Sequence, residues 1–281
     1  GKGHLTDYII IKTLEPKHVE IVWQPEVVKE FHTNGMKLEA LDKDGNVEDE
    51  WTVFSIGGGS LAEEGKRGHS SASVYPHDNI EDIIEWCREN HKNFVDYVKE
   101  FDDEDIMDYL RQIRITMRQS LNDGLKATDV IPGKLKLARR ARTFFRQYKV
   151  NKQLSSMIYA YALAVSEQNA SGFEIVTAPT CGSAGVLPAV LFTMQDFYGF
   201  DDEAVEEGLA VAGLIGIAVK KNASVSGAEV GCQGEVGVAC AMAAAAAAFM
   251  KGAALRKIEY AAEIGLEHHL GMTCDPAYGY V

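Results

Sequence analysis

Apolar and polar side chains alternate along residues 36–41, which is the pattern of a β-strand with one face against a core. A polar turn follows at residues 42–45, and an apolar run returns at residues 51–56. Two such runs, joined by a short turn that contains Asp and Gly, predict a β-hairpin. The glycine-rich segment at residues 57–60 then predicts the end of this N-terminal portion.

Farther along the chain the apolar positions recur every three to four residues, which is the period of an amphipathic helix. The first stripe predicts one continuous helix and consists of Ile80, Ile84, Cys87, His91, Phe94 and Val98, behind the N-cap residue Asn79. Further helices are predicted at residues 104–122, 154–168, 203–221, 235–250 and 255–270, and another begins near Val186. Cys87 falls on the apolar stripe, so we interpret it as a core residue. The expected fold is a mainly α domain, residues 61–281, with a small α+β N-terminal portion, residues 1–60.

The composition is that of an acidic globular protein. The 281 residues are 46% hydrophobic, which supports a sizeable core, and 41 acidic against 28 basic residues give a net charge of −13. This charge argues against nucleic acid as a partner and favours a small-molecule substrate. The basic run at residues 134–142 is interpreted either as a solvated helix face or as an attraction for an anionic substrate or partner.

Two apolar runs, residues 208–219 and 236–250, are shorter than the roughly 18–20 residues that span a bilayer. We therefore interpret both as buried core helices and expect no membrane partner. The first residues show no signal-peptide pattern, so the expected location is the cytoplasm. A reducing compartment suits the five cysteines, because an odd number in a chain of this length is not a disulfide framework.

The first candidate for chemistry is the stretch at residues 221–240, between these two runs. It combines glycines and small polar residues with two carboxylates and two thiols. Glycine and serine weaken a helix, and buried Asn, Ser and Glu side chains require hydrogen-bond partners. The stretch therefore predicts a functional turn buried between two helices.

Two other segments carry polar groups suited to chemistry. Residues 177–185 form a small, polar turn before a helix, where unpaired backbone N–H groups bind anions such as carboxylates. Within this turn Cys181 is open to three interpretations, as a nucleophile, a metal ligand or a packed thiol. His4, near the first residue, is either a catalytic imidazole or a solvated histidine.

Three longer motifs extend this pattern. They are Thr-Ala-Pro-Thr-Cys-Gly at residues 177–182, Asn-Ala-Ser-Val-Ser-Gly-Ala-Glu-Val-Gly-Cys-Gln-Gly-Glu at residues 222–235, and Glu-His-His-Leu-Gly-Met-Thr-Cys-Asp-Pro at residues 267–276. These motifs resemble those of the iron–sulfur-dependent bacterial L-serine dehydratases. Shorter matches at residues 1–4, 55–59, 131–133 and 162–167 keep the family's order, so the resemblance spans nearly the whole chain.

The resemblance implies that residues 1–60 are the C-terminal part of the family's beta domain. Residues 61–281 would be a helical iron–sulfur catalytic domain, the alpha domain, which we expect to be trimmed. The implied function is that of an L-serine ammonia-lyase, which converts L-serine to pyruvate and ammonia. The family uses a 4Fe–4S cluster in place of pyridoxal phosphate, and its open iron acts as a Lewis acid on the hydroxyl and carboxylate oxygens of the substrate.

The resemblance also implies the cluster ligands. Cys232 and Cys274 match two ligand positions of the family, and the third ligand would lie beyond Val281, so this chain alone is expected to be inactive. Cys240 matches no ligand position, and we interpret it as a packing residue. His4 matches a family histidine and is the candidate for proton transfer or substrate contact.

The remaining candidates are small and polar. Those for the serine carboxylate are Thr180, Gly182 and Ser183, and those that orient the ammonium group or the cluster are Asn222, Ser226 and Glu229. Helix-end capping is the alternative role of the last three. The expected partners are L-serine and further subunits, in a homodimer or an alpha/beta assembly. Two other functions stay open: a related iron–sulfur lyase for another small hydroxy- or thiol-amino acid, and a serine-binding regulatory or inactive paralogue.

Overall fold

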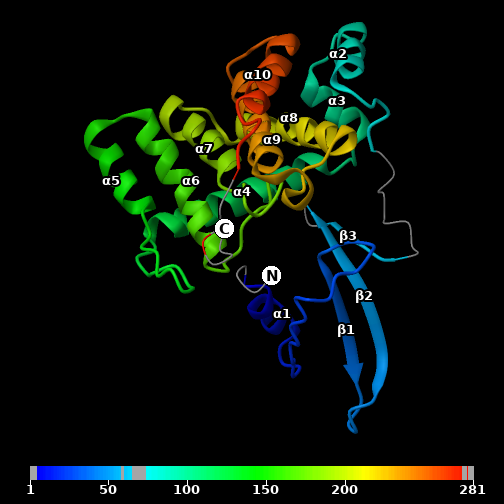
Figure 1. Cartoon of the computed structure of the whole chain (residues 1–281). Coiled ribbons are helices and arrows are strands. Elements are labelled where there is room, and N and C mark those ends of the chain that lie inside the picture. Colours follow the sequence, from blue (N-terminus) through cyan, green and yellow to red (C-terminus); the bar gives the residue numbers. More distant parts are fainter. Residues whose placement is uncertain (1–4, 58–59, 65–73, 274–276, 278–281) are drawn as a thin grey trace.

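The computed structural model describes residues 5–57, 60–64, 74–273 and 277. This described part contains ten helices and one three-stranded antiparallel sheet, which confirms the mainly α fold with a small N-terminal sheet. In Figure 1 helix α1 and the sheet lie together on one side of a larger body made of the other helices. The predicted boundary near residue 60 coincides with the start of strand β3 and stays a prediction.

The sheet confirms the predicted hairpin. Its strands are β1 (Gly35–Leu41), β2 (Val47–Gly57) and β3 (Ser60–Ala62), in the order β1-β2-β3. Asp42 stabilises the turn between β1 and β2, because its carboxylate accepts the backbone N–H groups of Asp44 and Asn46, each at 2.8 Å. Helix α1 (Thr6–Leu14), which precedes the sheet, has no buried residue.

The apolar stripe at residues 80–98 forms two helices, so the prediction of one continuous helix is wrong. These helices are α2 (Ile80–Glu89) and α3 (Phe94–Phe101). Between them His91 adopts a left-handed conformation with φ of 55°, and the Asn93 side chain caps α3 by accepting two backbone N–H groups. Asn79 caps α2 as predicted, and Cys87 is fully buried, which confirms it as a core residue.

The larger body is built from the helices that follow. They are α4 (Ile106–Lys126), α5 (Ala141–Asn151), α6 (Leu154–Ala170), α7 (Val186–Tyr198), α8 (Asp202–Asn222), α9 (Gly227–Met250) and α10 (Leu255–Glu267). All but α5 match helices predicted from the apolar period. Glycine permits close helix packing, since a Cβ atom on Gly124 of α4 would lie 2.2 Å from the carbonyl oxygen of Ala164 in α6.

The basic run at residues 134–142 is mostly a loop, so its interpretation as a helix face is wrong. Helix α5 begins only at Ala141. Arg139 points inward: its side chain is 3% exposed, pairs with Asp129 at 2.8 Å and donates to the hydroxyl of Ser171 at 2.7 Å. These polar partners hold the buried guanidinium group in place. They anchor Arg139 in the non-helical segment before α5.

Helix α9 packs against α7, α8 and α10 (Figure 1). Most of the stretch at residues 221–240 is helical, so the predicted buried turn is confined to residues 223–226. Among the described residues one helical segment, Glu229–Met250, has the length and apolar composition that could cross a membrane. Its Ala241 and Ala245 are buried in the core, as expected for a core helix.

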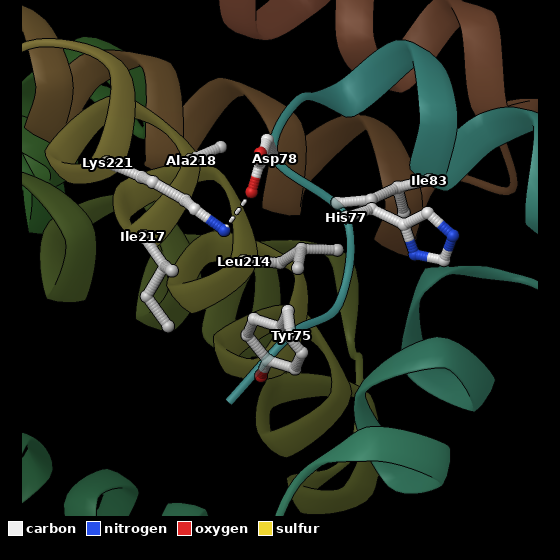
Figure 2. A pocket seen from close by; sticks show the side chains of 8 residues that line it. All are labelled: Tyr75, His77, Asp78, Ile83, Leu214, Ile217, Ala218 and Lys221. Atoms are coloured by element: carbon white, nitrogen blue, oxygen red, sulfur yellow. Dashed lines mark ion pairs between the residues drawn. The ribbon is translucent and has the colours of Figure 1, made fainter. Parts of the chain in front are cut away.

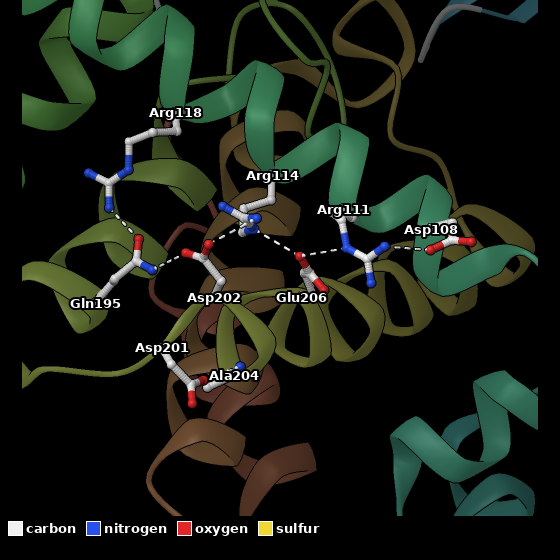
Figure 3. A network of polar contacts seen from close by, with 9 residues as sticks. All are labelled: Asp108, Arg111, Arg114, Arg118, Gln195, Asp201, Asp202, Ala204 and Glu206. Atoms are coloured by element: carbon white, nitrogen blue, oxygen red, sulfur yellow. Dashed lines mark hydrogen bonds and ion pairs between the residues drawn. The ribbon is translucent and has the colours of Figure 1, made fainter.

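A polar network joins α4 to α7 and α8 (Figure 3). Arg114 of α4 pairs with Glu206 of α8 at 2.9 Å, and their side chains are only 14% and 7% exposed. Arg118 of α4 pairs with Asp196 of α7 at 2.7 Å, and its guanidinium carbon lies 3.9 Å from the centre of the Phe192 ring. These pairs connect α4 to α7 and α8, the two helices of this network that pack against α9.

Candidate active site

The candidate site is organised around the first half of helix α9. The loop at residues 177–185 contacts this part of the helix through Thr180. The residues after α10 contact Gln233 in this half and Cys240 just beyond it. Segments that are far apart in the sequence therefore meet at one end of one helix.

The Glu235 carboxylate is the centre of these contacts. Glu235 is half-buried, and its Oε1 atom accepts a hydrogen bond from the Thr180 hydroxyl. Thr180 and Ser183 are buried, with their hydroxyl oxygens 3.1 Å apart, and Ser183 donates to the carbonyl oxygen of Ala178 at 3.3 Å. The loop and the helix are thus joined by a short chain of hydroxyl and carboxylate groups.

Two glycines lie directly beside this carboxylate. A Cβ atom on Gly182 would lie 2.5 Å from Oε1 of Glu235, and a Cβ atom on Gly227 would lie 2.8 Å from Oε2. Neither glycine has a positive φ angle, so the backbone conformation does not require glycine at either position. The requirement is one of space: both flanks of the carboxylate are occupied by backbone without a side chain.

Cys181 lies next to this group and is exposed. Its carbonyl oxygen accepts a hydrogen bond from the Asn169 side chain at 2.9 Å, which ties the loop to the end of α6. The surrounding protein desolvates the thiol, and the Glu235 carboxylate repels a thiolate, so both raise the pKa of Cys181. A raised pKa disfavours the nucleophile interpretation, because the thiolate is the reactive form.

The turn before α9 is anchored by Asn222 at the end of α8. The Asn222 side-chain amide donates to the backbone carbonyls of Asp78 at 2.6 Å and Ala218 at 2.9 Å. Beside it Lys221 pairs with Asp78 across a small pocket (Figure 2). These bonds match the helix-end role left open for Asn222, and its contact with substrate stays a prediction.

Ser226 and Glu229, the other two candidates near this turn, lie in different surroundings. Ser226 is buried, and its backbone N–H donates to the Ser224 hydroxyl at 3.1 Å. Glu229 is exposed and accepts a hydrogen bond from the same hydroxyl. Ser224 therefore links the turn to the first turn of α9, whereas the N-cap residue Ser226 makes no side-chain capping hydrogen bond. The substrate roles of Ser226 and Glu229 stay predictions.

Cys232 follows a break inside α9. Gly231 has φ of 67° and ψ of −171°, which is not helical, and this region of backbone conformations is essentially restricted to glycine. A Cβ atom at Gly231 would meet no atom within 4 Å, so the glycine is required by conformation alone. Cys232 is half-buried and lies at the start of the regular helix after the break.

The segment after α10 is held against α9 by two polar contacts. Gln233 accepts the backbone N–H of Gly271 at 2.7 Å, and the Cys240 sulfur lies 3.4 Å from Nε2 of His269. The other ring nitrogen of His269 lies 2.7 Å from the carbonyl oxygen of Gly265, so Nε2 is the acceptor for the Cys240 thiol. Burial raises the pKa of Cys240, which keeps this thiol protonated, and the residue connects two helices.

The structure therefore brings the predicted residues Thr180, Gly182 and Ser183 together around Glu235. Sequence reasoning did not assign Glu235, although it is the last residue of the 222–235 motif and lies three positions after Cys232, on the same face of a helix. The predicted residues His4 and Cys274 lie outside the described residues. In the described ranges no group of three or more His, Cys, Asp or Glu side chains is placed to hold a metal ion.

The amino-acid sequence is similar to those of known proteins. Residues 21–281 match the sequence model of the family described as serine dehydratase alpha chain. An L-serine dehydratase of Haemophilus influenzae is 40% identical over 268 residues, which cover 89% of this chain and 59% of that protein. An L-serine dehydratase of Streptomyces coelicolor is 39% identical over 267 residues, with the same two shares. L-serine dehydratase 1 of Escherichia coli is 34% identical over 333 aligned residues, covering 100% of this chain and 73% of that protein.

The chain belongs to the serine dehydratase alpha chain family. It spans about three fifths of the length of the first two relatives, each of which it covers to 59%. The sequence resemblance to bacterial L-serine dehydratases is thereby confirmed.

Proposed function

We propose that this chain carries the alpha-domain part of an L-serine ammonia-lyase, which converts L-serine to pyruvate and ammonia in the cytoplasm. The observation that carries the proposal is the placement of Thr180, Gly182 and Ser183 beside a carboxylate that lies one helical turn from Cys232. The names of the relatives support the same substrate. Residues 1–60 would belong to a beta domain, residues 61–281 to the catalytic domain, and the working assembly would be a homodimer or an alpha/beta complex.

The proposal includes an iron–sulfur cluster, and Cys232 fits one ligand position. Its thiol is a soft sulfur donor, it is half-buried, and it lies at a helix start created by Gly231. The second proposed ligand, Cys274, is outside the described residues. When bound, the cluster would supply a Lewis acid that makes the serine hydroxyl a better leaving group.

The residues of the chain would bind and orient the substrate. Backbone N–H groups of the loop at residues 177–185 would receive the serine carboxylate, with Thr180 and Ser183 holding the loop in place. Gly182 lies on an exposed part of the loop, and the absence of a side chain there lets the loop approach the Glu235 carboxylate. His4 would exchange a proton with the substrate.

The test is anaerobic reconstitution of the full-length protein with iron and sulfide, followed by an assay of pyruvate formed from L-serine. We expect the wild-type protein to bind iron and sulfide and to form pyruvate. We expect Cys232→Ser to lose most of the iron and the activity, because a hydroxyl is a poor ligand for such a cluster. Cys87→Ala is the matched control, since this thiol is buried between α2 and α3 and should leave the iron content unchanged.

Three results would contradict the proposal in different ways. A protein that binds the cluster fully and is silent on L-serine, yet eliminates water or hydrogen sulfide from another small amino acid, would be a related lyase. A protein that takes up no iron and binds L-serine would be a regulatory relative. Equal iron content in the Cys232→Ser variant and the wild type would remove Cys232 from the ligand set.

A further inference from the structure

We infer that Glu235 receives the ammonium group of the amino-acid substrate, with its Oε2 atom as the acceptor. This inference rests on the proposed function, because it concerns the binding of the same substrate. It gives Glu235 a role that the sequence had offered to Asn222, Ser226 and Glu229.

Within the described residues, the Glu235 carboxylate has no positively charged partner. The carboxylate is half-buried, and among the described residues it accepts a hydrogen bond from the neutral hydroxyl of Thr180. Across the same part of the chain, no ion pair joins Glu235 to Lys, Arg or His. A partly desolvated carboxylate without a cation is costly, and a substrate ammonium group would supply the missing charge.

The two oxygens of the Glu235 carboxylate have different surroundings. Oε1 is occupied by the Thr180 hydroxyl, whereas no hydrogen bond to Oε2 is found within the described residues. Gly227 lies beside Oε2, is exposed, and has no side chain that would cover this oxygen. Oε2 is therefore the oxygen with capacity for a new donor, and an ammonium group has three N–H donors.

The groups that lie near Glu235 suit the other end of an amino acid. Glu235 lies three residues after Cys232 on one face of α9, and the loop at residues 177–185 contacts it through Thr180. A zwitterionic amino acid needs a negative group for its ammonium and N–H donors for its carboxylate. Glu235 and this loop offer the two kinds of group side by side.

The other candidates for the ammonium group are less suited. Glu229 is exposed and already accepts the Ser224 hydroxyl, so it has little desolvation to balance. Asn222 and Ser226 carry no charge, and the amide of Asn222 is engaged with two backbone carbonyls. Among these candidates only Glu235 combines a negative charge with partial burial.

The experiment compares two inhibitors that differ in one group. L-alanine and L-lactate have the same carbon skeleton and carboxylate, but lactate has a hydroxyl in place of the ammonium group. Inhibition constants for both are measured against pyruvate formation by the reconstituted full-length protein. We expect the wild type to bind L-alanine at least about tenfold more tightly than L-lactate, as a charge-assisted hydrogen bond would provide.

Glu235→Gln is the decisive variant, because the glutamine carbonyl can still accept the Thr180 hydroxyl while the charge is lost. We expect the preference for alanine over lactate to fall by about tenfold, with a higher KM for L-serine and unchanged iron content and melting temperature. Glu263→Gln, which removes an exposed carboxylate on α10, should keep the wild-type preference.

A second variant keeps the inference testable if Glu235→Gln does not fold. In Gly227→Ala the new methyl group would lie beside Oε2, while the charge of Glu235 remains. It should weaken inhibition by alanine and leave inhibition by lactate nearly unchanged.

The outcomes separate this inference from the proposed function. A wild-type protein that forms no pyruvate from L-serine contradicts the proposed function. An active wild type whose Glu235→Gln variant keeps the alanine preference overturns the role of Glu235 and leaves the function standing. Loss of iron in Glu235→Gln also overturns it, because Glu235 would then serve the cluster.

Discussion

At the scale of single residues, glycines determine the geometry of the candidate site for two different reasons. Gly231 is needed for its backbone conformation, with φ of 67° and open space around it. Gly182 and Gly227 are needed for space, because side chains there would collide with the Glu235 carboxylate. A motif rich in glycine therefore does not indicate flexibility here: each glycine admits a specific neighbour or a specific bend.

The substitution Gly231→Ala tests the conformational reason. A Cβ atom in this region of φ and ψ is strained, so we expect the free energy of unfolding to fall by about 1–3 kcal/mol. Urea denaturation followed by circular dichroism measures the change. Gly213→Ala is the matched control: Gly213 lies within α8, also has no atom within 4 Å of its Cβ position, and has no positive φ. Alanine should stabilise that helix by about 0.5–1 kcal/mol, and equal effects at both sites would contradict the argument.

At the scale of elements, α4 is fixed to its neighbours by charge as well as by apolar packing. Arg114 and Glu206 form a buried pair between α4 and α8, and Asp202 of α8 accepts a second contact from Arg114 at 3.1 Å (Figure 3). Arg111 lies 3.6 Å from the same Glu206 carboxylate. Glu206 thus balances two arginines, and its removal leaves positive charge in a low-dielectric region.

The substitution Glu206→Ala should destabilise the fold strongly. Breaking a buried pair costs about 3–5 kcal/mol, and we expect the lower end because Asp202 still contacts Arg114. Asp108 is a partner of Arg111 whose side chain is 74% exposed. Its substitution in Asp108→Ala should lower the free energy of unfolding by about 1 kcal/mol or less. Urea denaturation measures the free energy of unfolding of both variants. If Glu206→Ala loses no more of it than Asp108→Ala does, the α4–α8 pair does not stabilise the fold.

At the scale of the whole molecule, burial differs strongly between the N-terminal portion and the helical body. Helix α1 has no buried residue, and Val22 and Val28 in the segment after it are each 71% exposed. Helix α9, by contrast, packs against α7, α8 and α10 and contains a run of buried alanines. Figure 1 shows the same division, with α1 and the sheet to one side of the helical body.

Hydrogen–deuterium exchange should report this division. Opening of α9 breaks contacts with three helices, so we expect its backbone amides after Val238 to be among the slowest to exchange. The amides of α1 should exchange by local opening, many times faster. Mass spectrometry of peptides from the folded chain gives both rates in one experiment. Comparable rates in α1 and α9 would contradict the expected distribution of stability.

The sequence by itself determined the features that depend on near neighbours. Alternation and helical period predicted the hairpin and most of the helices, and Asn79 identified the start of α2. The 222–235 motif indicated the region of the candidate site and the family to which the chain belongs. Such signals can be read locally because a strand, a helix or a cap is stabilised within a few residues of itself.

Only the tertiary structure decided which groups meet. Thr180 and Glu235 are 55 residues apart, and nothing in their local patterns pairs them. The same applies to Arg139, whose inward position follows from its contact with Ser171, 32 residues away. The apolar stripe through His91 also continues in sequence, while the chain bends there to place α3 against α8. Long-range packing selects among conformations that local propensity leaves close in energy, and here it placed the carboxylate of Glu235 at the centre of the candidate site.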